Sequence, residues 1–205
     1  MPLYKTIEIE NGRLFFWEIS ETEEEMRHLF PDAAADPAFL RLNGSRRKME
    51  WFAVRALLLS AGCHSNHLCY LDSGEPCIEH PEFTQISISH SDRFAGLFLH
   101  RSARIGLDIE NRHRNFIRVE KKYLSEEEIR LAHSLPDGHG YFWCIKEAVY
   151  KAAGIPGLHF SRQIRISLTP GEAMLLHKEV VRFKTVCTAW EDQLVVWVIS
   201  ETKHP

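Results

Sequence analysis

The sequence predicts an α+β (α/β) fold of two pseudo-symmetric, similar halves, each a small, mostly antiparallel sheet packed with helices. Segments with apolar residues at every second position predict strands, and two longer segments with helical apolar spacing predict helices. One order of elements also recurs: a strand, a short acidic helix and a long helix ending in glycine start at residue 13 and again at residue 104. We therefore expect domains at residues 1–102 and 103–205.

The first elements are a hairpin and a helix. Residues 4–20 alternate as two strands do, and Asn11-Gly12 predicts the turn because this dipeptide adopts positive φ angles at low cost. Residues 21–30 begin with glutamates that suit the start of a helix. The Pro- and Ala-containing residues 31–39 are expected to form a loop.

The middle of the chain carries the long helices. Residues 45–62 start with a serine cap and end with a glycine, which predicts a helix. Residues 69–83 are turn-rich and predict a loop, and residues 85–110 predict two or three strands with tight connections. Residues 125–135 and 141–154 predict a short and a longer helix. The tail is expected to add a strand at 163–168 and a hairpin of 180–190 with 193–200.

Composition excludes several classes of protein. The 205 residues include 25 basic and 28 acidic ones, a net charge of −3, so global charge gives no case for nucleic-acid binding. No apolar run reaches the ~18 residues of a membrane span, and the N-terminus has no apolar signal core. The five cysteines are odd in number and lack Cys-x-x-Cys spacing, which fits a reducing compartment better than a disulfide framework or zinc site. We expect a cytoplasmic protein.

The segment "IGLDIE" places two carboxylates side by side. Side chains alternate along a strand, so Asp108 and Glu110 face one side while Ile105, Leu107 and Ile109 face the other. Taken alone, this alternation favours a half-buried edge strand with a wet outer face. Two neighbouring carboxylates are tolerable mainly when a cation lies between them, so a third partner decides between the two interpretations.

The helix at 141–154 offers that partner. Trp143, Glu147 and Lys151 form one stripe, and an ordinary surface ion pair between Glu147 and Lys151 would explain two of them. Together with Asp108 and Glu110, however, Glu147 would complete an oxygen-ligand set for Mg²⁺ or Mn²⁺. Lys146 and Lys151 would then neutralise a bound diphosphate. Such a site requires the fold to bring Glu147 within coordination distance of both strand carboxylates.

The two motifs together resemble the 4′-phosphopantetheinyl transferases, whose signatures are Gly-x-Asp-x-Glu and then Trp-x-x-Lys-Glu-Ala-x-x-Lys. The first matches in "IGLDIE" and the second at "WCIKEAVYK". The length and the two-half layout resemble the Sfp-type branch, a monomer with its active site between the halves. The resemblance covers roughly residues 45–155 by motif and the rest only by layout.

This resemblance implies a set of site residues. The family's metal ligands fall on Asp108, Glu110 and Glu147, and its phosphate-contacting lysine falls on Lys151. Its Ser-His pair falls on Ser89 and His90, although His90 without the family would be an ordinary strand-end histidine. The residues for coenzyme A that remain are Lys146, Gly74 and Pro76, with Arg47 and Arg55 (Arg46 less so) for the 3′-phosphate unless they form a solvated helix face.

The resemblance implies transfer of the phosphopantetheine arm of coenzyme A to a serine of an apo carrier protein, with release of adenosine 3′,5′-bisphosphate. Asp108, Glu147 and Lys151 would form the catalytic group, and Glu147 is the candidate base, directly or through water. Glu75 stands where the family commonly has lysine, which leaves open how the nucleotide end is held. Val54 also replaces a glycine of one branch.

The basic segment 111–122 suggests the protein partner. It carries five basic residues and adjoins the expected metal site, which suits an acidic acyl or peptidyl carrier protein, although an ordinary solvated loop has the same composition. Two alternatives remain: a metal-dependent diphosphate hydrolase, and a non-catalytic binding module for coenzyme A or the carrier. The sequence leaves open the carrier, the choice between Mg²⁺ and Mn²⁺, the base and the oligomeric state.

Overall fold

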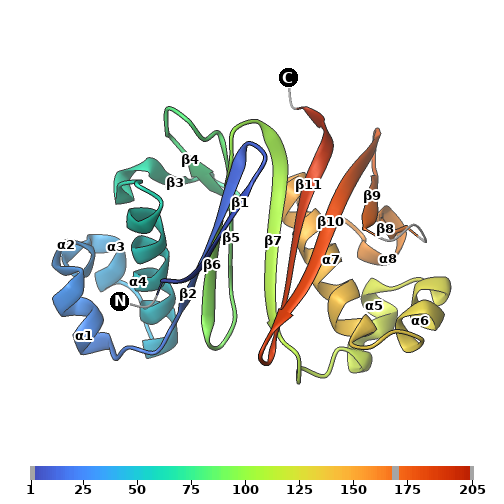
Figure 1. Cartoon of the computed structure of the whole chain (residues 1–205), viewed down its shortest axis with the longest axis horizontal. Coiled ribbons are helices and arrows are strands. Elements are labelled where there is room, and N and C mark those ends of the chain that lie inside the picture. Colours follow the sequence, from blue (N-terminus) through green and yellow to red (C-terminus); the bar gives the residue numbers. More distant parts are fainter. Residues whose placement is uncertain (1–2, 168–170, 204–205) are drawn as a thin grey trace.

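Two antiparallel sheets lie face to face between outer layers of helices (Figure 1). This computed structural model describes residues 3–167 and 171–203. The first sheet has the strand order β1-β2-β6-β5, and the second has the order β7-β11-β10-β9-β8. The predicted α+β class of antiparallel sheets packed with helices is confirmed, and none of the described helices is long and apolar enough to cross a membrane.

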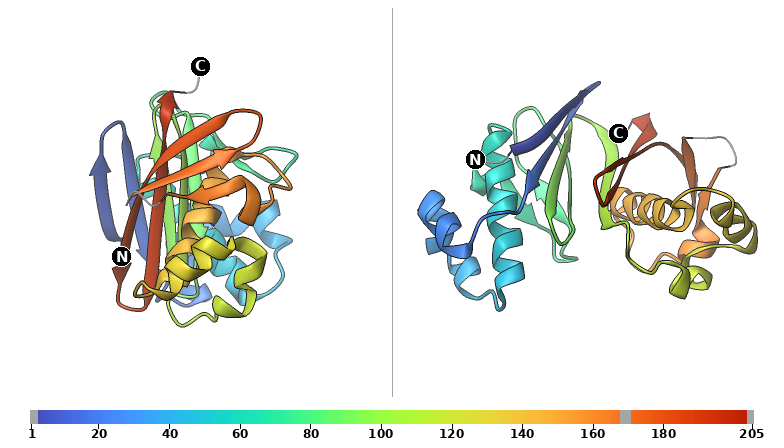
Figure 2. Two further views of the ribbon diagram at one scale, coloured as in Figure 1. Left: turned by 90° about the vertical axis from the view of Figure 1, so that its right-hand side faces the viewer. Right: turned by 60° about the horizontal axis from the view of Figure 1, so that its bottom comes forward.

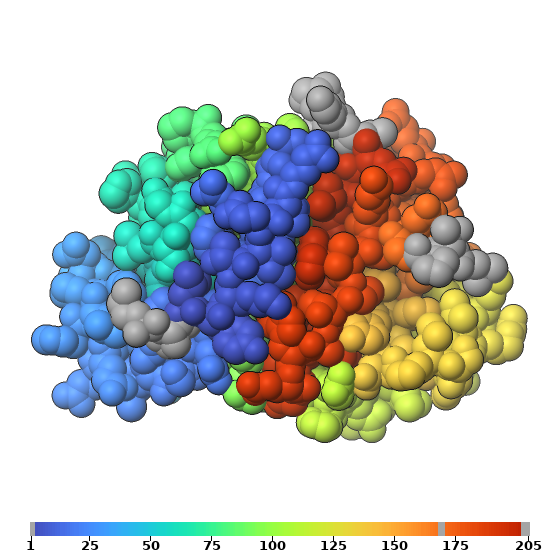
Figure 3. Space-filling model, in the orientation of Figure 1, coloured from blue at the N-terminus to red at the C-terminus, as the bar shows by residue number. Residues whose placement is uncertain are grey.

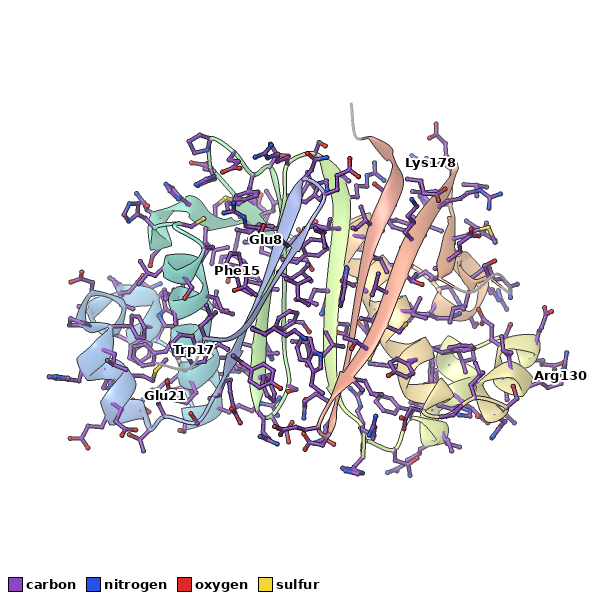
Figure 4. The ribbon with its side chains drawn as sticks, in the orientation of Figure 1. Glu8, Phe15, Trp17, Glu21, Arg130 and Lys178 are labelled. Carbon is purple, nitrogen blue, oxygen red and sulfur yellow. A yellow bond between two sulfur atoms is a disulfide. The ribbon has the colours of Figure 1, made fainter. Side chains whose placement is uncertain are left out.

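The first sheet is built from the N-terminal part of the chain. Its strands are β1 (Leu3–Ile9), β2 (Gly12–Glu18), β5 (Gln85–His90) and β6 (Phe94–His100). Its helices are α1 (Glu23–Leu29), α2 (Pro31–Ala35), α3 (Pro37–Leu40), α4 (Ser45–Ser60) and the 3₁₀ turn η1 (Ser65–His67). Phe15 and Trp17 point from β2 toward these helices (Figure 4), and both belong to the core that α4 forms with this sheet.

The second sheet is built from the C-terminal part of the chain and begins with a single strand before its helices. Its strands are β7 (Ala103–Asn111), β8 (Ile164–Ile166), β9 (Glu172–Leu176), β10 (Val180–Trp190) and β11 (Gln193–Lys203). Its helices are η2 (Ile117–Val119), α5 (Glu120–Tyr123), α6 (Glu126–His133), α7 (Gly138–Ala153) and α8 (Phe160–Gln163). In each sheet the strand before the helices pairs with the last strand, β2 with β6 and β7 with β11. The long helices α4 and α7 lie on the outer faces (Figure 2).

A third core joins the two sheets. Phe16 and Phe98 of the first sheet pack with Leu107, Val195 and other apolar residues of the second. The hairpin β1-β2 also reaches the end of β10, since the Phe16 and Trp190 rings lie 4.5 Å apart. Figure 3 shows this contact as the N-terminal strands lying against the C-terminal ones. The sheets therefore bury apolar surface on both faces.

Several local expectations were wrong in detail. Ile9 pairs with Gly12, so the turn consists of Glu10 and Asn11, and it is Asn11 that has a positive φ of 58°. Gly12 opens β2 instead, where an added Cβ would lie 2.8 Å from the Leu99 carbonyl oxygen. The expected loop at 31–39 forms α2 and α3, because Pro at the first helical position is favourable.

Three more corrections concern residues 44–83 and the tail. The N-cap of α4 is Gly44, not the serine that follows it. The expected loop at 69–83 contains the strand pair β3 (Leu68–Tyr70) and β4 (Pro76–Ile78). Cys69 and Cys77 lie opposite each other in that pair and form a disulfide, which the cysteine count did not predict. The predicted strand 163–168 is β8 in its central part, and residue 168 lies outside the described residues.

Candidate active site

Strand β7 presents its two carboxylates toward α7. Ile105, Leu107 and Ile109 belong to the core between the sheets, as alternation predicts. Gly106 faces the helix so closely that an added Cβ would lie 1.8 Å from the Ala148 carbonyl oxygen. This glycine therefore permits α7 to pack directly on β7, beside Asp108 and Glu110 on the same face.

Two serines of β5 hold the outer edge of β7. The Leu107 amide donates to Ser87 Oγ at 3.0 Å, and the Ile109 amide donates to Ser89 Oγ at 3.1 Å. The side chains of β5 thus replace the backbone partners that a neighbouring strand would supply. Because both serines are buried, they fix the first sheet against the strand that carries the carboxylates.

Lys151 of α7 bonds to both β5 and β7 where these two strands meet. Its Nζ donates to Asp108 Oδ1 at 2.8 Å, to the Leu107 carbonyl at 2.9 Å and to Ser89 Oγ at 3.1 Å. These three bonds use all three ammonium donors. The structure therefore brings Lys151, Asp108 and Ser89 together.

The Asp108 carboxylate is only half satisfied. Its Oδ1 is bonded to Lys151 and to Ser89, whereas its buried Oδ2 has no partner of standard hydrogen-bond geometry among the described residues, although the buried Cys144 thiol lies against the carboxylate. The whole residue is 5% exposed. A buried oxygen without a partner is costly, so this atom is a candidate ligand for a cation.

Glu110 is held by an aromatic and a cation. Trp143 Nε1 donates to Glu110 Oε1 at 2.9 Å, and Arg114 donates to the same oxygen. The Arg114 guanidinium also lies 4.6 Å from the centre of the Trp143 ring. Trp143 of the predicted stripe thus orients one of the two strand carboxylates.

Glu147 lies one turn before Lys151 and has no hydrogen-bond donor among the described residues. Burial raises the pKa of Glu147 from 4.5 to about 7, and the negative charges of Asp108 and Glu110 add to this effect against the opposing Lys151. A cation bound near these groups would relieve the repulsion that raises this pKa.

The residues fit a hard divalent cation in their chemistry. Three carboxylates lie near enough to influence one another electrostatically, one with an unpartnered buried oxygen and another with a raised pKa, and Mg²⁺ prefers carboxylate ligands. Their ligand atoms are not all within 4.8 Å of one another in this structure, unlike those of two other clusters among the described residues. Lys151 and Arg114 engage the strand carboxylates instead.

Two cavities open on either side of this group. One of about 270 Å³ is lined by Gly74, Glu75, Pro76, Lys151 and neighbouring residues of β5 and α7. The other, of about 500 Å³, is lined by Glu147, Trp143, Arg114 and apolar residues near α8. The stripe of α7 therefore runs from one cavity to the other.

His90 lies at the end of β5 against α4. Its Nδ1 is 3.2 Å from Glu50 Oε1, which also accepts a bond from Arg46. Partial burial and the cations Lys151 and Arg46 lower the pKa of His90, while Glu50 opposes them. His90 and Arg46 therefore share the Glu50 carboxylate, close enough to Lys151 for its charge to act on the histidine.

Two other arginines of α4 lie differently. Arg47 is exposed and makes no ion pair within the described residues. Arg55 is 7% exposed, stacks on Trp51 with 3.2 Å between its guanidinium carbon and the ring centre, and bonds to Tyr70. The structure thus groups Arg46, not Arg55, with His90.

Lys146 is fully buried and away from this group of contacts. Its Nζ donates to Glu128 at 2.8 Å and to the carbonyls of Ile164 and Phe160 at 2.7 and 3.1 Å. Burial lowers the pKa of Lys146 to about 8, and Glu128 opposes that shift. The sequence expectation placed Lys146 beside a diphosphate, whereas the structure places it among α6, α7 and β8.

Sequence reasoning missed three residues of this region. Arg114 lies within the basic segment but contacts Glu110, and their opposite charges four residues apart were the available signal. Ser87 shares a strand face with Ser89 through simple alternation. Glu50 was missed because it lies four residues after Arg46, where the sequence predicts only an ordinary ion pair within a helix.

Fold and site together define a class of protein: an α+β chain of two sheets, with carboxylates, a lysine and a histidine at the junction between the sheets. Such a site suits a phosphate-containing substrate. A family comparison agrees with this chemistry. Residues 104–196 match the model of the 4′-phosphopantetheinyl transferase superfamily, so the chain carries a domain of that superfamily. A comparison with curated proteins found no match.

Proposed function

We propose that this protein is a Mg²⁺-dependent holo-[acyl-carrier-protein] synthase that transfers 4′-phosphopantetheine from coenzyme A to a serine of an apo carrier protein. One observation carries the proposal. The α7 stripe of Trp143, Glu147 and Lys151 meets Asp108 and Glu110 between two cavities, and all five lie within the residues that match the superfamily model.

The cavities suit the two substrates. Coenzyme A would occupy the cavity with Gly74, Pro76 and Lys151, with its 3′-phosphate toward His90 and Arg46. The carrier serine would approach from the cavity that contains Glu147. Glu75 lines the first cavity, so the nucleotide end lacks the usual lysine cation there.

In the reaction, the serine oxygen attacks the β-phosphorus and forms a phosphodiester. The bond from this phosphorus to the bridging oxygen breaks, and adenosine 3′,5′-bisphosphate leaves. Glu147 accepts the serine proton, directly or through water, because it faces the cavity from which the serine would approach. Lys151 stabilises the departing phosphate charge. Asp108, Glu110 and Glu147 would hold Mg²⁺ or Mn²⁺, which supplies charge neutralisation for the diphosphate when bound.

The decisive experiment incubates the protein with coenzyme A, Mg²⁺ and a panel of apo carrier proteins. Mass spectrometry should show a gain of about 340 Da on the carrier serine, the mass of the arm joined as a phosphodiester. A carrier with alanine at that serine is the control and should gain nothing. Release of phosphopantetheine without any carrier would identify a hydrolase instead, and binding without turnover would identify a non-catalytic module.

The carrier is expected to dock on the basic segment and the adjoining cavity. Arg118, Lys121 and Lys122 are exposed and form no ion pair within the described residues, and Ile117 among them is 54% exposed. Lys122 lines the cavity that contains Glu147, together with apolar Leu158 and Phe160. An acidic carrier with a small apolar patch complements this surface.

Reversing Arg118, Lys121 and Lys122 to glutamate should raise the KM for carrier about tenfold or more, because attraction to an acidic partner becomes repulsion. The KM for coenzyme A should stay the same, since these residues lie outside the other cavity. Arg130→Glu on the far side of α6 (Figure 4) is the matched control. Steady-state kinetics at two salt concentrations measure both constants, and an unchanged carrier KM contradicts this docking surface.

The proposal includes a monomer in the cytoplasm. Cys63, Cys144 and Cys187 are free, which is usual in a reducing compartment, whereas the Cys69–Cys77 disulfide is not. Differential alkylation of the protein in intact cells decides this point. Free thiols at Cys69 and Cys77 support the cytoplasm, and a persistent disulfide opposes it.

A further inference from the structure

Two histidines and a glutamate meet near the start of α7, whereas the cavity proposed for coenzyme A is lined by its last turn. Glu120 begins α5, His133 ends α6 and His139 lies in the first turn of α7. His139 Nε2 lies 2.8 Å from Glu120 Oε2, and His133 Nε2 lies 3.6 Å from the same oxygen. We propose that this His–Glu cluster is a second metal site, specific for a borderline transition cation such as Zn²⁺.

The spacing suits such a cation. In a tetrahedral Zn²⁺ site with bonds of ~2.0–2.1 Å, neighbouring ligand atoms are roughly 3.3 Å apart. The two observed separations, 2.8 and 3.6 Å, bracket that value, and all three ligand atoms lie within 4.8 Å of one another. Small side-chain rotations would therefore be enough to place them around one ion.

A simple hydrogen bond explains only part of the arrangement. His139 and Glu120 form an ordinary hydrogen-bonded pair, with side chains 10% and 16% exposed. His133 adds a second ring, 4.4 Å from the first between centres, that approaches the same oxygen without hydrogen-bonding to it. Two imidazole nitrogens and a carboxylate around one point form a recurrent zinc ligand set.

In both histidines, Nε2 is available to bind a cation. A ligating histidine needs its other nitrogen protonated, usually as a donor. Among the described residues, no donor points to Nδ1 of His133 or His139, so both can carry the proton there while Nε2 binds a cation. A cavity lined by both rings leaves room for a water ligand at a fourth position.

A second cluster of potential metal ligands does not leave its histidine nitrogens available. Cys63, His67 and His80 also have ligand atoms within 4.8 Å of one another. However, the His64 amide donates to His67 Nδ1, and the Glu82 amide donates to His80 Nδ1. These bonds place the ring proton on Nε2 of each histidine, so this group does not present free nitrogen lone pairs.

Ligand type separates the proposed site from the carboxylate site. Imidazole nitrogens favour Zn²⁺ or Co²⁺, whereas an all-oxygen set favours Mg²⁺ or Mn²⁺. The three ligands come from three helices, so a bound ion would tie α5, which ends the basic segment, to α6 and α7. The inference is independent of the transferase activity.

The test uses the full chain without a histidine tag, stripped with chelator and then dialysed against Zn²⁺. Wild type should bind one Zn²⁺ per chain by elemental mass spectrometry, show a higher Tm with the ion, and give the absorption of tetrahedral Co²⁺ after substitution. His133→Gln, which changes an exposed helix-end residue, should weaken binding at least about tenfold, as should Glu120→Gln. His28→Gln, an exposed histidine in the last turn of α1, is the matched control and should bind as wild type does.

Three results would overturn the inference. The first is that wild type takes up no Zn²⁺. The second is that both His133→Gln and Glu120→Gln bind Zn²⁺ as tightly as wild type. Alternatively, binding is lost in His67→Gln or Glu147→Gln, which would place the ion at one of the other two groups. Because His133 is 54% exposed in its side chain, its variant should fold, so the comparison remains interpretable if Glu120→Gln does not.

Discussion

Replacing Lys146 by methionine is expected to lower the free energy of unfolding by about 3–5 kcal/mol, because it leaves the buried Glu128 carboxylate without its cation. The lysine is fully buried, and its three donors are all used within the fold. Urea unfolding followed by circular dichroism measures the change. The midpoint should fall while the slope stays constant.

A double variant that also changes Glu128 tests whether the lost stability comes from this ion pair. Glu128 also accepts hydrogen bonds from the Ser125 and Ile166 amides, which glutamine could retain in part. The double variant Lys146→Met, Glu128→Gln should therefore regain part of the loss, because no uncompensated charge remains. Exposed Lys122→Met should change stability by less than about 0.5 kcal/mol. A folded, stable Lys146→Met with a raised KM for coenzyme A would instead assign this lysine to the substrate.

Glu147→Gln is expected to lower kcat about 100- to 1,000-fold, since it removes the candidate base and a charge at the diphosphate. The same variant has a readout that needs no turnover. Between pH 4.5 and about 7 the folded state holds the Glu147 proton more tightly than the unfolded state does. Unfolding then releases protons, so this group makes wild type less stable as pH rises through that window.

Without divalent metal, Glu147→Gln should therefore be more stable than wild type at pH 8, by up to about 3 kcal/mol, and similar to it at pH 4. Mg²⁺ should raise the Tm of wild type at pH 8 but not that of the variant. Exposed Glu127→Gln is the control and should follow wild type. Equal stabilisation of wild type and Glu147→Gln by Mg²⁺ would remove Glu147 from the proposed ligands.

Local patterns were sufficient to predict much of the site. Alternation predicted that Asp108 and Glu110 share a face, and helical spacing predicted that Trp143 lies on the Lys151 side of α7. Both predictions depend only on the side-chain periodicity within a single strand or helix. The strand and helix signals likewise predicted the fold class, because periodicity survives whatever the tertiary contacts are.

Properties that depend on packing between elements were not predictable. Lys146 and Glu128 are joined because α6 meets α7, and Arg55 is buried where it stacks on Trp51. Cys69 faces Cys77 because the short pair β3-β4 sets their register. The domain division at 102 and 103, the metal ligands and the coenzyme A residues stay predictions until the experiments above are done.

The serines that hold β7 also cover the edge of its sheet. The exposed edge of a sheet offers unpaired amides to other chains and can promote aggregation. Here the Leu107 and Ile109 amides are taken up by Ser87 and Ser89, and the Leu107 carbonyl by Lys151. The side chains that position the candidate active site thus also protect the strand from intermolecular pairing.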